Sequence, residues 1–298
     1  MTGRRRWSLT KWVSGTFSVF ALLALAALLV LFIRQSLPVW RQEGWGFLTG
    51  KRWFYRQEEF GLAPMLHGTV AVALVALGLA APLGIGAAIF TAEFLSTRLR
   101  LIVKVAIELL AGIPSVVYGL LGILLLRDWV YEAMERFEPL SGDTLLTGGI
   151  LLGVMILPTI MTLSDDALRT VPASQRLAAR ALGLNSTETV LHVSLRQALP
   201  GLVAAILLAV GRACGEMIAV FLVVGRQDNQ WPDKLFSAKP LLEAGQTLST
   251  KLGSSETNIA YGDPLHWAAM VALGLVLLAL VTFITAIGVR LQRSPHET

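Results

Sequence analysis

Gly211-Arg212-Ala213-Cys214-Gly215-Glu216 places an arginine and a glutamate inside an apolar run from Leu199 to Val224. A side-chain charge near the middle of a bilayer costs roughly 2.5–3.5 kcal/mol on insertion scales, so two charges in one span normally face protein, water or a substrate. Arg212 and Glu216 are four residues apart, which predicts that both lie on one face of a helix. The stretch therefore indicates a membrane scaffold that presents this face to a polar pathway.

The composition of the whole chain is that of a polytopic membrane protein. Of its 298 residues, 54% are hydrophobic and 15% are charged, whereas a soluble domain carries about 25% charged residues. The basic residues behind the net charge of +5 lie in short segments between apolar runs, which indicates membrane topology rather than a nucleic-acid partner. One cysteine and four scattered histidines exclude an intramolecular disulfide framework and offer no metal-ligand spacing, so we expect no metal.

The first apolar run, Val13–Ile33, is long enough to cross the hydrocarbon core. It is longer than the apolar region of a signal peptide and leads into Arg34 rather than a small-residue cleavage site, so we interpret it as a membrane anchor. The other predicted spans are Met65–Ala92, Leu101–Leu126, Leu145–Leu163, Leu199–Val224 and Trp267–Val289. The sequence thus predicts an all-α protein with six membrane helices. Residues 1–64 would form the tail, first helix and an outer segment, and residues 65–292 the core.

The distribution of basic residues predicts a side of the membrane for each loop. Segments 1–12, 93–100, 164–198 and 290–298 together hold twelve Lys and Arg against five Asp and Glu, whereas the other loops hold eleven against thirteen. By the positive-inside rule the first set is cytoplasmic. We therefore expect both termini in the cytoplasm.

The third predicted span contains a signal for a helix break. Pro114, in Gly112-Ile113-Pro114-Ser115, removes a backbone hydrogen bond, so the helix should kink or break near residue 113. Broken helices often line cavities, but a kink used only for packing explains the proline as well. Glu108, about 10 Å from the cytoplasmic start of this span, is a candidate pathway residue. Pairing with Lys104 one turn earlier, or snorkelling, is its alternative role.

The longest cytoplasmic connection, residues 164–198, predicts a helical hairpin. Residues 173–182 are good helix formers, Gly183 suits a left-handed C-cap, and Asn185 followed by Glu188 is typical of a capping box. Two roles stay open from the residues alone. The basic side chains favour an amphipathic hairpin on the lipid surface, and the helix–turn–helix pattern favours a docking surface for a cytoplasmic partner.

Three motifs resemble a known family. They are Glu108-Leu-Leu-Ala-Gly-Ile-Pro-Ser-Val-Val-Tyr-Gly119, Ala178-Ala179-x-x-x-Gly183 and Gly211-Arg-Ala-x-Gly-Glu216. The middle motif alone marks ABC importers in general, but the three together look like a permease subunit of the phosphate-specific ABC importer. Phe47-Leu-Thr-Gly-Lys-Arg-Trp53 and Met217-Ile-Ala-Val220 are more similar to its PstC-type permease than to its PstA-type permease.

This resemblance implies a type I ABC importer permease (MetI-like) fold in the bacterial inner membrane. It also implies partners: a second homologous permease, a pair of cytoplasmic ATPase subunits, a phosphate-binding protein on the outer side and, as further candidates, phosphate-sensing regulators. The chain has no Gly-x-x-x-x-Gly-Lys-Ser/Thr phosphate loop, so ATP would be bound and hydrolysed by another chain. We therefore expect no cofactor and no catalytic residue here.

The resemblance further implies that the hairpin at 164–198 couples the permease to the ATPase. The expected coupling residues are Ala178, Ala179, Arg180, Gly183 and Glu188. Two positions depart from the family's loop motif: Leu177 stands where it has glutamate, and Arg196 where it closes on proline. The ion pair normally made by that glutamate is therefore in question, and Arg180 or Glu188 is expected to substitute.

Arg212 and Glu216 are the principal pathway candidates, with Glu108 as a third. Arg212 lies roughly 20 Å along the helix from Leu199, and Glu216 one turn farther. The planar guanidinium suits two oxygens of a phosphate and keeps its charge at every relevant pH. Glu216 would neutralise Arg212 in the empty path and accept a hydrogen bond from a protonated phosphate. A purely structural Arg–Glu pair between helices is the alternative.

Other functions remain open from the residues alone. Within transport, the chain could be a permease for another oxyanion such as sulfate, molybdate or phosphonate, or an autonomous anion channel. A membrane-embedded regulator or enzyme using Glu108 and Glu216 as acid and base is less well supported, because the predicted topology puts them near opposite faces of the membrane. The loop at 226–266 predicts one short outer helix or none.

Overall fold

The computed structural model describes residues 3–232 and 239–292, and these are mostly helical. The long helices are α1 (Gly3–Glu43), α3 (Ala63–Ile89), α4 (Thr97–Ala111), α7 (Leu145–Arg169), α10 (Leu195–Cys214) and α14 (Pro264–Gln292). The shorter helices are α2 (Gly46–Thr49), α5 (Ser115–Leu121), α6 (Arg127–Met134), α8 (Ala173–Ala181), α9 (Ser186–Thr189), α11 (Ile218–Val223), α12 (Leu248–Leu252) and α13 (Glu256–Ala260).

Short elements connect or extend these helices. Strands β1 (Trp53–Phe54) and β2 (Glu59–Phe60) pair antiparallel, with Trp53 opposite Phe60. The π-helical turns are η2 (Phe90–Phe94), η3 (Gly122–Leu126) and η5 (Val190–Ser194), which extend α3, α5 and α9. The 3₁₀ turns are η1 (Tyr55–Gln57), η4 (Glu135–Phe137) and η6 (Lys239–Leu242).

The predicted set of spans is confirmed in outline. In the described part of the chain, five helices are long and apolar enough to cross a membrane, and the number rises to six if one bent pair is a single span. That pair joins Thr97–Ala111 to Ser115–Phe137 at an angle of 84°. Its break contains Gly112 and Pro114, and Pro114 is the N-cap of α5. The break predicted near residue 113 is therefore confirmed.

The span predicted at Leu199–Val224 is not one continuous helix, and this part of the prediction was wrong. α10 ends at Cys214 and α11 begins at Ile218. At the end of α10, the amides of Gly215 and Glu216 bond to carbonyls three residues back, at 3.2 and 3.1 Å. Glycine is a poor helix former, but the apolar residues on both sides of Gly215 make the pattern look continuous. Arg212 and Glu216 consequently do not share a helix face.

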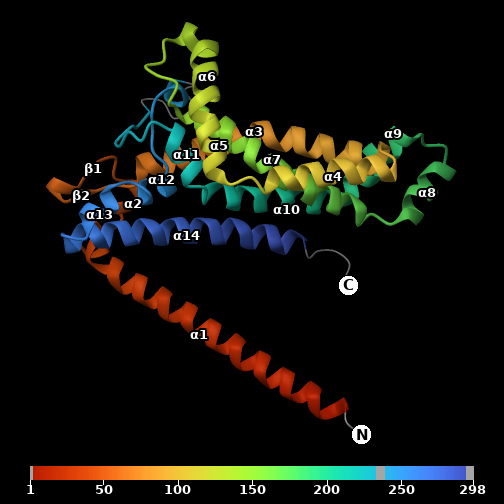
Figure 1. Ribbon diagram of the computed structural model, residues 1–298, viewed down its shortest axis with the longest axis horizontal. Helices are drawn as coiled ribbons and strands as arrows, with labels where there is room; N and C mark the ends of the chain where they lie inside the picture. Colours follow the sequence, from red (N-terminus) through yellow and green to blue (C-terminus); the bar gives the residue numbers. More distant parts are fainter. Residues whose placement is uncertain (1–2, 233–238, 293–298) are drawn as a thin grey trace.

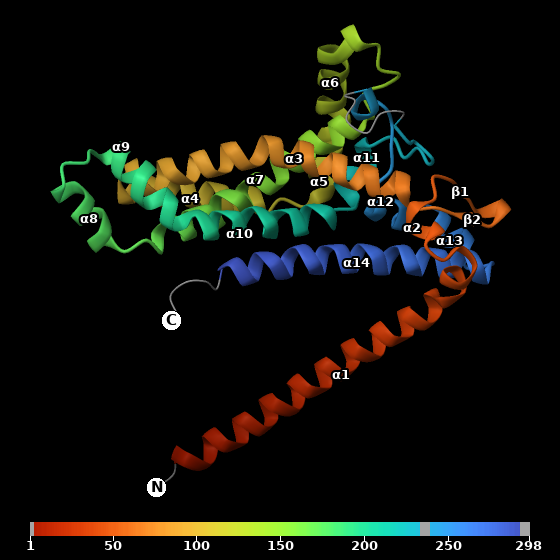
Figure 2. The same ribbon diagram turned by 180° about the vertical axis from the view of Figure 1, so that it is seen from behind.

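The centre of the bundle is the close packing of α3 on α7, which small residues permit. A Cβ on Gly84 of α3 would lie 2.9 Å from Ile160, and a Cβ on Gly153 of α7 would lie 3.0 Å from Leu79. Backbones can approach closely where glycine replaces a larger side chain. α10 packs on α7, and α14 lies between α10 and α1 (Figure 2). Helix α1 contacts α14 near their shared end and then diverges from the bundle.

The two ends of the molecule differ. The hairpin of α8 and α9 forms one end, while the strands, α2, α6, α12 and α13 lie toward the other (Figure 1). The start of α1 and the end of α14 point toward the hairpin end (Figure 1), which agrees with the prediction that both termini share a side with 164–198. Residues 1–2 and 293–298 lie outside the described residues, and the cytoplasmic location stays a prediction.

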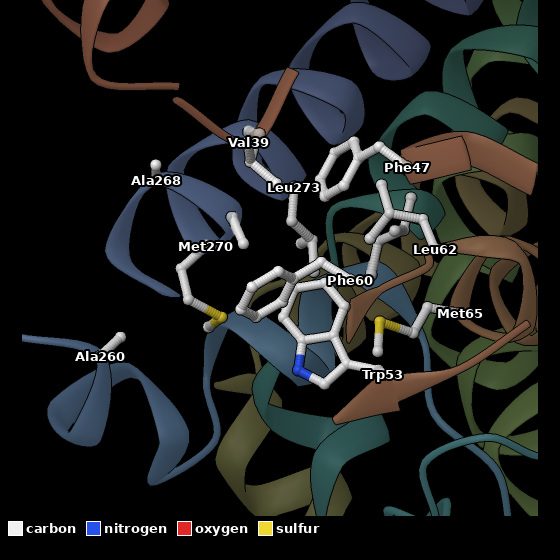
Figure 3. Packing of buried hydrophobic residues seen from close by; sticks show 13 residues of the cluster. Val39, Phe47, Trp53, Phe60, Leu62, Met65, Ala260, Ala268, Met270 and Leu273 are labelled. Atoms are coloured by element: carbon white, nitrogen blue, oxygen red, sulfur yellow. The ribbon is translucent and has the colours of Figure 1, made fainter. Parts of the chain in front are cut away.

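The end opposite the hairpin is a folded cap with its own hydrophobic core. Figure 3 shows Phe47, Trp53 and Phe60 packed with Met270 and Leu273 of α14. The N-terminal segment that the sequence separated from the core thus packs directly on α14. The loop at 226–266 contributes η6, α12 and α13 to this end, more than the one short helix expected, while residues 233–238 lie outside the described residues.

The predicted hairpin is confirmed. α8 spans Ala173–Ala181, and Gly183 has a left-handed φ of +91°. The side chain of Asn185 accepts a hydrogen bond from the Glu188 amide at 2.8 Å, and the Glu188 carboxylate accepts one from the Asn185 amide, also at 2.8 Å. The second arm then runs through η5 into α10 without a loop.

Candidate pathway site at two helix breaks

Arg212 lies in the last turn of α10, with its side chain exposed. Its guanidinium donates one hydrogen bond, to the hydroxyl of Thr159 on α7, at 3.1 Å. Thr159 follows Pro158, a proline in the interior of α7. This Pro-Thr pair inside an apolar span is the sequence signal that could have indicated a polar partner for Arg212. Since a guanidinium has five donors, most of the hydrogen-bonding capacity of Arg212 remains available to a ligand.

Glu216 lies in the break between α10 and α11, and its contacts are those of a cap. Its carboxylate accepts a hydrogen bond from the Ala219 amide at the start of α11, at 3.4 Å. Its backbone carbonyl accepts a hydrogen bond from the Ser249 hydroxyl of α12, at 2.8 Å. The ion pairs within residues 3–232 and 239–292 do not include Arg212 with Glu216. The expected neutralising pair is not formed, because α10 ends before Glu216.

A small cavity with a mixed polar and apolar lining adjoins Glu216. Its volume is about 10 Å³, and its lining includes Cys214 together with the hydroxyl residues Thr69, Thr247 and Ser249. A space of this size is at the lower limit for one water molecule and is too small for a phosphate. An oxyanion would therefore meet Arg212 on the exposed side of α10 in this conformation, and not from the cavity beside Glu216.

The two helix breaks lie next to each other. A Cβ on Gly119 of α5 would lie 2.5 Å from a methyl of Leu222 and 3.2 Å from Cα of Ala219, both on α11. Three residues farther along, a Cβ on Gly122 would lie 2.8 Å from Val223. The residue numbers of the contacts increase together on both segments, so α5 and α11 run parallel and begin at the same end of the contact. The fold thus brings together the breaks that the sequence places a hundred residues apart.

Glu108 is exposed on α4, before the first break. Lys104, its proposed partner, lies 3.9 Å from Asp166 of α7 instead. The predicted Glu108–Lys104 pair is therefore not formed, because Lys104 is directed toward α7. A part for Glu108 in the pathway stays a prediction.

Several helices of the bundle also expose large apolar side chains. Exposed side chains on α4, α5, α7 and α11 include Leu109, Val116, Leu120, Val154 and Ile218. An exposed charge in such surroundings is costly if lipid covers it. The exposed guanidinium of Arg212 is therefore better suited to a protein partner or a polar path than to lipid.

The expected coupling residues have different surroundings on the hairpin. Ala179 is buried, whereas Ala178 and Arg180 are exposed. Glu188 is engaged in the capping box, so it does not replace the motif's glutamate as we expected. Instead, Arg176, which precedes Leu177, forms an ion pair with Glu93 of η2 at 3.0 Å. No local sequence pattern indicates this pair, because the two residues are 83 positions apart.

A second group of charges, which sequence reasoning missed, is buried in the cap. Lys251 of α12 has an exposed fraction of 1% and pairs with Asp228 at 2.7 Å and with Glu256. Glu256 also accepts hydrogen bonds from Nε1 of Trp53 and from Nε2 of His266. We call these five residues the lysine cluster. A lone lysine within Leu248-Ser-Thr-Lys-Leu252 carries no periodic signal of such a role.

The lysine cluster shifts the acidity of its carboxylates. Burial raises the pKa of Asp228, although Lys251 opposes this shift. Burial would also raise the pKa of Glu256, but the hydrogen bond and charge of Lys251, with the bonds from Trp53 and His266, hold it below its ordinary value. No group of three or more His, Cys, Asp or Glu in 3–232 and 239–292 is placed to hold a metal ion.

Comparisons with known proteins bear on both fold and function. The family described as binding-protein-dependent transport system inner membrane component matches residues 80–296. Among relatives, the phosphate transport system permease protein PstC of Mesorhizobium japonicum is 33% identical over 82% of this chain and 77% of that protein. The phosphate transport system permease protein PstC 1 of Mycobacterium tuberculosis is 31% identical over 93% of this chain and 91% of that protein.

Two solved structures share the fold at lower identity. A bacterial ABC transporter involved in the import of the acidic polysaccharide alginate has a TM-score of 0.53 at 15% identity, covering 96% of each chain. An inward-facing MetNI methionine ABC transporter has a TM-score of 0.51 at 20% identity, covering 78% of this chain and 93% of that chain. These likenesses support the MetI-like permease fold and say nothing about the substrate.

Proposed function

This chain belongs to the binding-protein-dependent transport system inner membrane component family, and we propose that it is a PstC-type permease subunit of an ABC importer for inorganic phosphate. The observation that carries the substrate is the identity of 31–33% with proteins named phosphate transport permeases, over most of the chain. The chain is a transport subunit rather than an enzyme, and ATP hydrolysis by a partner chain drives it.

The partners follow from the family. An importer of this kind needs a second permease, an ATPase and an external binding protein, and its permeases reside in the inner membrane. We further propose that both termini lie in the cytoplasm, that the ATPase is a dimer docked at the α8–α9 hairpin, and that the binding protein is specific for phosphate. The charge distribution across the loops supports this orientation.

Arg212 is the residue that we propose receives the anion. Its guanidinium is exposed beside the two helix breaks and has one hydrogen-bond partner, Thr159, in the described part of the chain. Two parallel N–H donors match two phosphate oxygens. Alternating access would expose this face first to one side of the membrane and then to the other as the hairpin moves.

Glu216 has a more limited proposed role. In the present conformation it caps α11 and does not pair with Arg212. When phosphate is bound, the Glu216 carboxylate can accept a hydrogen bond from a protonated phosphate oxygen. Sulfate is fully ionised at neutral pH and has no proton to donate. The substitution Glu216→Gln should therefore reduce the preference for phosphate over sulfate more than it reduces total uptake. Equal loss of both would contradict this role.

The test of the function is uptake by the purified assembly in proteoliposomes, with the permease pair, ATPase and binding protein present. We expect ATP-dependent accumulation of radiolabelled phosphate, and we expect that excess sulfate, molybdate or phosphonate does not inhibit this uptake. Inhibition of phosphate uptake by one of these oxyanions would identify that oxyanion as another substrate. Anion flux through this chain alone, without ATPase or binding protein, would show a channel and overturn the proposal.

A further inference from the structure

The α8–α9 hairpin is attached to the membrane helices unequally. Its first arm joins α7 through three residues, 170–172, and its second arm continues through η5 into α10. α8 packs chiefly on α9 and η5, the other arm of the hairpin, and Ala179 is the one buried residue in the helix. By backbone contact alone, α8 could therefore swivel on the short linker 170–172.

The side chain of Arg176 connects α8 to the membrane helices on the other side of that linker. One guanidinium nitrogen lies 3.0 Å from the Glu93 carboxylate of η2, and the other donates a hydrogen bond to the backbone carbonyl of Leu168, the penultimate residue of α7, at 2.6 Å. A single side chain of α8 thus contacts the ends of both α3, through η2, and α7 that lie beside the hairpin. These are the two helices that pack most closely in the centre of the bundle.

The pair is more shielded than an ordinary surface ion pair. The Glu93 side chain is 7% exposed and that of Arg176 is 22% exposed. Exposed pairs contribute little because water screens them, whereas loss of one partner from a shielded pair leaves a charge without compensation. Arg176 therefore resists rotation of α8 more strongly than an exposed arginine would.

The neighbouring charges continue the connection to α4. Arg100 of α4 donates to the Ala92 carbonyl in η2 at 3.0 Å and pairs with Asp165 of α7 at 3.3 Å. α4 leads directly to the break at Gly112–Pro114. The ends of α3, α4 and α7 are thus held together beside the point at which Arg176 contacts them.

We propose that Arg176 and Glu93 are positioning residues that brace α8 on the α3–α7 pair, so that movement of the docked ATPase is transmitted to the helix breaks instead of being absorbed at 170–172. The inference rests on the proposed function and adds residues outside the family's loop motif. Leu177, at the motif's glutamate position, is 65% exposed. In this chain the adjacent Arg176 supplies the inward ion pair.

The test measures phosphate import and ATP hydrolysis together in the reconstituted assembly. Arg176→Met and Glu93→Gln should each lower import roughly tenfold while hydrolysis changes less than about twofold, so that less phosphate enters per ATP. The exchange Arg176→Glu with Glu93→Arg should recover import to within about threefold of the parent, because the pair is re-formed with opposite polarity.

The matched control is Arg98→Met, which removes an exposed arginine of α4 outside the ion pairs described here. It should leave import per ATP at the parental value. Proportional loss of import and hydrolysis in the single variants, or no recovery in the exchange, would overturn the proposal. So would single variants that fail to assemble, if the exchange restores assembly without restoring import per ATP. A parental complex that does not import phosphate would refute the function itself.

Discussion

The lysine cluster of the cap and Arg212 at the helix breaks both place charge in an apolar protein, but they treat it in opposite ways. Lys251 is almost completely buried and has two carboxylate partners, one of which also accepts hydrogen bonds from Trp53 and His266. Arg212 is exposed and bonds to one hydroxyl. The ammonium of Lys251 is paired within the protein, whereas the remaining guanidinium donors of Arg212 are available to a ligand that binds and dissociates.

This difference assigns a structural role to the lysine cluster and a transport role to Arg212. A buried charge that is paired with carboxylates of the protein holds segments together, and removing one partner is strongly destabilising. An exposed arginine costs the fold little when it is replaced, because surface substitutions rarely change stability by more than about 0.5 kcal/mol. The contrast predicts that the two regions respond oppositely to substitution: stability changes in the cap, and transport changes at the breaks.

The largest expected effect is that of Lys251→Met. It leaves the largely buried Glu256 and the partly exposed Asp228 without their cation, which should cost about 3–5 kcal/mol of unfolding free energy. The measurement is thermal unfolding of the purified chain in detergent. The triple variant Asp228→Asn, Lys251→Met, Glu256→Gln should be clearly more stable than the single variant, because no charge is left unpaired.

The control for this comparison is Arg52→Met, an exposed cationic residue of the same cap. It should unfold at the parental temperature. If Lys251→Met is as stable as Arg52→Met, the cluster is not the constraint that its geometry indicates.

The next effect in size is that of Gly119→Val at the contact between α5 and α11. The added side chain would collide with Leu222 and Ala219, and overpacking typically costs about 1–3 kcal/mol. Gly78→Ala in α3 is the matched control, because nothing lies within 4 Å of its added Cβ. Unchanged thermal stability in Gly119→Val would show that the two breaks are not packed together.

A smaller effect is the pH dependence of the cap. Because the pKa of Glu256 is held below its usual 4.5, its stabilising contribution is complete above that value and is lost as the pH falls through the folded-state pKa. Asp228 opposes this, since its raised pKa favours the folded state at low pH. The stability advantage of the parent over Glu256→Gln should therefore shrink as the pH falls below about 4.5. A constant advantage would contradict the shift.

The smallest expected change in stability is that of Arg212→Gln, within about 0.5 kcal/mol. Thermal unfolding and co-purification with the partners should both match the parent. Destabilisation comparable to that of Lys251→Met would make Arg212 a structural residue and remove the contrast between the two regions.

Much of this fold could be predicted from the sequence because its signals are local. Apolar length gave the spans, Pro114 gave one break, and Asn185 with Glu188 gave the start of the second hairpin arm. The break after Cys214 could not be predicted in this way, since apolar residues flank it on both sides. Contacts such as Arg176 with Glu93, or Lys251 with Asp228, depend on which distant segments meet, and no spacing in one sequence encodes that.

The measurement that tests the central claim most directly is phosphate import by the assembled complex carrying Arg212→Gln, compared with the parent and with Arg212→Lys. We expect import to fall at least about tenfold in Arg212→Gln, which corresponds to about 1.4 kcal/mol, with normal assembly and stability. Arg212→Lys should retain part of the activity, because it keeps the charge but loses the bidentate geometry. Import at the parental rate in Arg212→Gln would contradict the claim that this arginine receives the anion.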